Sequence, residues 1–146
     1  MSKKLLFNNV GGSETPPTEE RTEVTIFPPF QNWEMENSSN ATINTLSDNT
    51  VDITCSGYPD FYAELSATVT SGKTYVIKAD EIGDTKLQIL LLTGWTTSNM
   101  LTIKATDFVN GEYKFTAARN YSVCEIESSS YPSSIILRNV KWYTVP

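Results

Sequence analysis

Residues 61–80 read FYAELSATVTSGKTYVIKAD, and this stretch decides the fold class. Every second residue from Ala63 to Val69 is apolar and the residues between them are polar, which is the period of a strand with one buried face. Ser71-Gly72 interrupts the pattern, and a second alternation runs through residues 74–80. Two alternating runs around a glycine turn predict a β-hairpin.

The same alternation recurs on both sides of this stretch at spacings of roughly 8–12 residues. It covers residues 41–44, 51–55, 86–93, 101–104, 113–117, 121–126 and 135–143. Residues 86–93 are apolar on both faces, which predicts a central strand or an oligomer contact. The last run is long, and we expect a bulge near Arg138. No segment has a sustained helical period. The chain is therefore predicted to be all-β, an antiparallel β-sandwich or jelly roll of about eight strands.

The predicted core consists of apolar residues on the buried side of these runs: Leu65, Val69, Tyr75, Ile77, Leu87, Ile89, Leu91, Ile103, Tyr113, Phe115, Ile126 and Leu137.

The first thirty residues differ in composition, with Gly11-Gly12, Pro16-Pro17 and Pro28-Pro29. We expect residues 1–30 to be an extended N-terminal attachment arm and residues 31–146 to be the jelly-roll domain. A disordered tail is the alternative, but the apolar residues favour docking onto a partner. The predicted partner-binding residues of the arm are Leu5, Leu6, Phe7, Val24, Ile26, Phe27 and Phe30.

Composition narrows the function classes. The chain has 146 residues, which fits one domain, and a net charge of −6 with no histidine. Neither nucleic acid nor an anionic membrane is expected as a partner. Asn8 and Asn9 interrupt the signal-like apolar start, so we expect a soluble protein that is made in a cytosol and not secreted. Cys55 and Cys124 are expected to be buried free thiols rather than a disulfide.

The sequence contains no motif that clearly predicts a nucleotide site, a metal site or a catalytic site. Residues 67–74, ATVTSGKT, resemble a phosphate-binding loop, but they lie between two strand-like runs with no helix to follow. Asp80, Glu81 and Asp84 could offer oxygens to calcium, yet short acidic turns usually face water, so no metal or other cofactor is predicted. A chain without histidine lacks the usual base for a nucleophile, so no enzyme is predicted. A carboxylate-pair glycosidase is the one open alternative.

Aromatic residues beside predicted turns are the remaining candidates for a binding site. Trp33, Trp95 and Tyr131 are the predicted glycan contacts, with Tyr58 in a similar position. Trp95 is the strongest because its neighbours Gly94, Thr96, Thr97 and Ser98 are small. The alternative is that these rings cover the ends of the core.

Four short motifs carry a family resemblance: Phe61-Tyr62, the TSGKTY turn of residues 70–75, the FTA of residues 115–117 and the ILRNV of residues 136–140. Together, over residues 33–143, they resemble the jelly-roll modules of carbohydrate-binding families that are reused in bacteriophage head and tail proteins. Sugar-binding members often carry an acidic residue for a structural calcium on the closing strand, where this chain has Arg138-Asn139. The resemblance therefore does not imply that ion here.

The resemblance and the proline-rich arm together imply a bacteriophage virion protein, decorating the capsid as a head fibre or built into the tail or baseplate. It would lie in the virion after synthesis in the host cytoplasm, bind other virion proteins and form a homo-oligomer. The alternative implied function is a carbohydrate-binding module that acts as a host-receptor adhesin on a cell-surface glycan.

Overall fold

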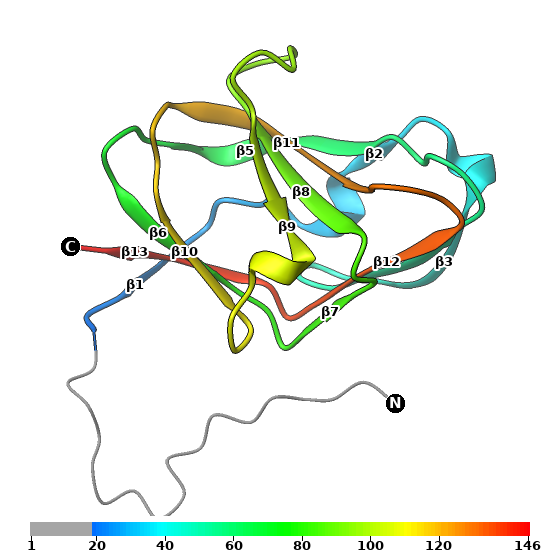
Figure 1. Ribbon diagram of the computed structural model, residues 1–146, viewed down its shortest axis with the longest axis horizontal. Helices are drawn as coiled ribbons and strands as arrows, with labels where there is room; N and C mark the ends of the chain where they lie inside the picture. The colour runs from blue at the N-terminus through cyan, green and yellow to red at the C-terminus, as the bar shows by residue number, and fades with distance from the viewer. Residues whose placement is uncertain (1–18) are drawn as a thin grey trace, which may run out of the picture.

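The structure of the protein, a computed structural model, describes residues 19–146, so Leu5, Leu6 and Phe7 lie outside the described part. Its strands are all antiparallel and form three sheets, which confirms the all-β sandwich (Figure 1). The described residues contain β1 (Thr22–Val24), β2 (Glu34–Met35), β3 (Ala41–Leu46), β4 (Val51–Cys55), β5 (Phe61–Val69), β6 (Thr74–Lys78), β7 (Glu81–Gly83), β8 (Leu87–Leu92), β9 (Leu101–Lys104), β10 (Glu112–Thr116), β11 (Tyr121–Ser128), β12 (Ser133–Arg138) and β13 (Lys141–Val145).

Three single-turn 3₁₀ helices complete the described part: η1 (Phe30–Asn32), η2 (Ser38–Asn40) and η3 (Ala105–Asp107). No helix among residues 19–146 has the length and hydropathy needed to cross a bilayer.

The sheets form two layers. One layer is the five-stranded sheet β2-β5-β11-β8-β9. The other consists of two four-stranded sheets, β1-β13-β6-β10 and β3-β4-β12-β7. These two sheets are continuous, because β6 runs into β7 past Asp80, β12 runs into β13 past Asn139, and the Asp80 amide donates to the Arg138 carbonyl at 2.8 Å. The strand count is thus higher than about eight, because two long strands are interrupted and several short strands were not predicted.

The stretch that decides the fold is not a hairpin. β5 pairs with β2 and β11, whereas β6 pairs with β10 and β13, so residues 70–73 cross from one layer to the other. The Thr70 amide donates to the Tyr75 hydroxyl at 2.8 Å, and Gly72, with φ of 88°, donates its amide to the Ala117 carbonyl at 2.8 Å. Alternation reveals which face of a strand is buried, but it does not reveal which strand lies beside it.

The core lies between the layers and follows the predicted list closely. Of the predicted residues, Leu65, Tyr113 and Phe115 are half-buried and the other nine are buried. Cys55 and Cys124 are buried free thiols, as predicted. β8 lies between β11 and β9 and is apolar and buried on both faces, which confirms it as an interior strand.

The predicted boundary at residue 30 is corrected by the structure, because residues 22–30 pack into the body. Val24 lies in β1, which pairs with β13. Ile26 and Phe30 are only 3% and 1% exposed, and the Ile26 carbonyl accepts from the Ser66 amide at 2.7 Å. The Phe27 ring packs edge-on against Trp33 and Trp142. Pro28-Pro29 interrupts pairing locally, but the rings on either side of it are apolar enough to be drawn into the core.

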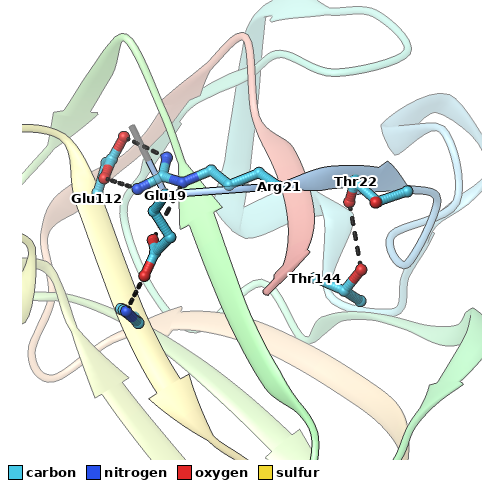
Figure 2. A network of polar contacts seen from close by, with 6 residues as sticks. Glu19, Arg21, Thr22, Glu112 and Thr144 are labelled. Carbon is cyan, nitrogen blue, oxygen red and sulfur yellow. Dashed lines mark hydrogen bonds and ion pairs between the residues drawn. The ribbon is translucent and has the colours of Figure 1, made fainter. Parts of the chain in front are cut away.

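The start of the described chain is held against the outer surface of the β1-β13-β6-β10 sheet. Figure 2 shows Arg21 reaching across the sheet to Glu112 on β10, where its two terminal nitrogens donate at 2.8 and 2.9 Å. Glu19 contacts Arg21 and Lys114, and the Arg21 guanidinium lies 5.9 Å from the Tyr143 ring centre. The Arg21 hydrogen bonds lower the pKa of Glu112, and the Lys114 hydrogen bond lowers that of Glu19.

Candidate functional site

A groove of about 840 Å³ lies on the outer face of the five-stranded sheet, on the layer opposite Arg21. On β5, Phe61 and Ala63 point into the core while Tyr62 and Glu64 point outward. On β11, the neighbouring strand, Glu125 points outward into the same groove. The strand period that builds the core therefore also places these side chains on one solvent-facing surface.

Aromatic rings form one wall of this groove. Trp95, in the loop after β8 that projects from the top of the view in Figure 1, is 64% exposed. Its ring meets Tyr62 edge to face, with centres 5.4 Å apart and planes at 87°. Tyr58 supplies a third ring. An exposed indole fixed against a second ring is a flat apolar surface that is already in position for a ligand.

Five carboxylates form most of the remaining polar lining, together with Asn32, Thr96 and Thr97. The carboxylates come from β2 and the turn after it, the β4–β5 loop, β5 and β11: Glu34, Glu36, Asp60, Glu64 and Glu125. Among the described residues that line the groove there is no lysine or arginine. We call this feature the acidic groove.

Two tyrosine hydroxyls bind these carboxylates. Tyr62 donates to Glu36 at 2.5 Å, which raises the pKa of Tyr62 to about 12. The Tyr58 hydroxyl contacts both Asp60, at 3.0 Å, and Glu125. A phenol has one proton, so Tyr58 can donate to only one of the two carboxylates at a time. The other carboxylate is left with an unmatched acceptor.

Burial raises the pKa of Glu125, and repulsion from Glu127 adds to this shift, while the Tyr58 hydrogen bond opposes it. Burial likewise raises the pKa of Glu127, with a further contribution from Asp60. Burial, followed by the bond to Glu125, raises the pKa of Tyr58 above its usual range. Negative charge is thus costly at this end of the groove, and a positive group there would relieve it.

The structure places the three predicted glycan contacts in different environments. Trp95 lines the acidic groove. Trp33 does not, because its ring is 7% exposed, stacks on Phe61 and donates to the Pro28 carbonyl at 3.0 Å, so it is a core residue and has no free face. Tyr131 is half-buried against the core, its hydroxyl accepts from the Ser128 amide at 2.9 Å, and it lies outside the lining of the groove.

Sequence reasoning missed Tyr62 and the five carboxylates as parts of a site. The signal was present, because Tyr62 and Glu64 occupy the polar side of the same alternation that predicted the β5 core. Their relation to Glu125 depends on the pairing of β5 with β11, which alternation does not specify.

The acidic turn considered for calcium is occupied by protein contacts. Asn139 donates to Asp80 at 2.7 Å, Arg138 donates to Glu81 at 2.8 Å, and the Lys86 amide donates to Asp84 at 3.1 Å. Within residues 19–146, no three histidine, cysteine or acidic side chains gather so that they could hold a metal ion.

Comparison with known proteins gives no family. No protein-family model matches the chain, and no curated protein matches it. Among solved structures, a chain of the glycosylation-associated protein (Gap123) complex from Streptococcus agalactiae is similar over 86% of this chain, with 10% identity and a TM-score of 0.49. The match covers 25% of that chain. Similarity at this level carries no argument about function.

Proposed function

We propose that this chain is a carbohydrate-binding β-sandwich module and that the acidic groove is its binding surface. The observation that carries the proposal is Trp95, which is 64% exposed and fixed edge to face on Tyr62 beside a row of carboxylates. A sugar ring has an apolar face of C–H groups and a rim of hydroxyl donors. The indole suits the face, and carboxylate oxygens accept strongly from the rim.

The arrangement of Asp60 and Glu125 favours binding over hydrolysis. A glycosidase places two carboxyl groups on either side of the scissile bond, roughly 5–10 Å apart, so that the bond lies between them. Here the Tyr58 hydroxyl contacts both Asp60 and Glu125 and fills the space between them. The pair is therefore suited to holding a ligand through hydrogen bonds and not to cleaving it.

A glycan array followed by calorimetry tests this function. Trp95→Ala is expected to weaken binding of any glycan that the wild type retains by about tenfold or more, which corresponds to about 1.4 kcal/mol. The fold should be unaffected because the side chain is largely exposed. Ile43→Ala is the matched control, since Ile43 is 54% exposed on β3, in the other layer. Absence of wild-type binding to every glycan, or unchanged binding by Trp95→Ala, would refute the proposal.

A second proposed role is structural, as a bacteriophage virion subunit attached through its N-terminal residues, with copies associating as a homo-oligomer. One observation favours attachment of this kind. The Arg21–Glu112 contacts hold the start of the described chain on one layer, while the acidic groove opens on the other. A tether on that side leaves the groove free. Deleting residues 2–18 should abolish incorporation into particles under this role, and retained incorporation would exclude it.

A further inference from the structure

We propose that the acidic groove selects glycans that carry protonated amino groups over neutral or acidic ones. This inference rests on the proposed carbohydrate-binding function and specifies the class of sugar. It is drawn from three features of the groove: its charge, its balance of donors and acceptors, and its aromatic wall.

The charge of the lining is the first feature. Five carboxylates line the groove, and no described lysine or arginine shares the lining with them. The carboxylates of a typical protein surface are interspersed with cations, as Glu19 and Glu112 are on the opposite layer. A uronic acid or sialic acid in the groove would meet only like charge, which disfavours binding.

The balance of hydrogen bonds is the second feature. Tyr62 satisfies one oxygen of Glu36, and Tyr58 offers a single proton to Asp60 and Glu125 together. Asn32, Thr96 and Thr97 also line the groove and can donate, but the two oxygens of each of the five carboxylates still present more acceptor sites than these donors can satisfy. An ammonium group carries three donors and no acceptor, so it matches this surplus better than a hydroxyl or an N-acetyl group does.

The aromatic wall is the third feature. The faces of Trp95 and Tyr62 attract cations as well as C–H groups, and Trp95 is exposed enough to offer its face. A sugar that stacks on Trp95 would hold an amino substituent at the carboxylate-lined part of the same groove. A basic peptide satisfies the charge but does not use the flat indole surface for ring stacking.

Calorimetry with three matched probes at pH 6 tests the inference: a glucosamine oligomer, its fully N-acetylated counterpart of the same length, and an oligolysine with the same number of positive charges. The glucosamine oligomer should bind at least tenfold more tightly than either other probe. Glu125→Gln and Asp60→Asn should each reduce, several-fold, the ratio of the affinity for the glucosamine oligomer to the affinity for the N-acetylated oligomer. Glu23→Gln, which removes an exposed carboxylate on β1 in the other layer, should leave the ratio unchanged.

The outcomes separate the two claims. If the N-acetylated oligomer binds as tightly as the glucosamine oligomer, amine selectivity is wrong while carbohydrate binding stands. If oligolysine binds as tightly as the glucosamine oligomer, the groove recognises basic peptides, and both claims fail. If neither oligomer binds, amine selectivity is wrong, and the proposed function fails as well only if no glycan of the array binds. If Glu23→Gln also reduces the ratio of the two sugar affinities, the preference for the glucosamine oligomer comes from the net charge of the protein and not from the groove, and the inference is overturned.

Discussion

Replacing Phe30 by alanine tests whether the segment before residue 31 is part of the folded body. The Phe30 side chain is 1% exposed and its ring lies 5.1 Å from Trp33 and 6.0 Å from Phe27, centre to centre. Removing a buried phenylalanine typically costs about 3–5 kcal/mol, because transfer energy is lost and a cavity is left. A residue in a solvated arm would change stability by no more than about 0.5 kcal/mol.

Urea denaturation measures this difference directly. With a slope of about 2 kcal/mol/M for a protein of this size, a loss of about 4 kcal/mol lowers the midpoint by about 2 M. The thermal midpoint should fall by roughly 6–20 °C. Thr25→Ala is the control within the same segment, because Thr25 is exposed, and its midpoint should match that of the wild type. If Phe30→Ala and Thr25→Ala unfold at the same urea concentration, residues 22–30 are an arm after all, and the core described above is wrong.

The remaining predictions concern pH. Arg21→Gln should lower stability at pH 7 by a few tenths to about 1 kcal/mol, as is typical of a surface ion pair. Arg21 holds the pKa of Glu112 below its ordinary value of 4.5, so this stabilisation is present above that pH and disappears as the pH falls below it. Thermal midpoints of both proteins from pH 3 to pH 7 should converge at the acid end, and a constant gap would contradict the assignment. Glu125→Gln should behave in the opposite way. Because folding raises the pKa of Glu125, the wild type loses stability as the pH rises from 4.5 through the folded pKa, and the variant does not. The stability of Glu125→Gln relative to the wild type should therefore increase between pH 4 and pH 7, and a flat difference would show that Glu125 is not perturbed.

Strand identity was predictable because it is a local property. The alternation in residues 61–69 and 74–78 is set by which face of each strand is buried, and both strands occur where the sequence places them. The strands that pair with them were not predictable in the same way. Hydrogen bonds of Tyr75 and Gly72 fix a crossing between the two layers. A glycine turn between two strands has the same sequence pattern whether it closes a hairpin or connects the two layers.

Two further errors have a common cause. Pro28-Pro29 and the turn residues near Trp33 are typical of irregular chain, and they predict an arm at Phe30 and an exposed ring at Trp33. The structure buries both rings in one aromatic cluster with Phe61. Irregular backbone does not imply an exposed side chain when large apolar rings can fill the end of a core. Trp95, whose neighbours in the sequence are small, contacts only one aromatic ring in the described part of the chain, the outward-facing Tyr62, and is exposed, as predicted.

The pairing of the first described strand with the last one affects how the molecule responds to tension. Thr22 lies opposite Thr144 and Val24 opposite Trp142, so Glu19 and Pro146 are at the same end of an antiparallel pair. A force that pulls these two positions apart acts across the peptide hydrogen bonds, which are perpendicular to the strands, and breaks them one after another from that end. The hydrogen bonds of the β1–β13 pair therefore break sequentially from this end, and they do not share the load as they would if the strands were pulled parallel to their axes. Once this pair has opened, Ile26 and the aromatic cluster behind it are the next part of the protein to bear the load.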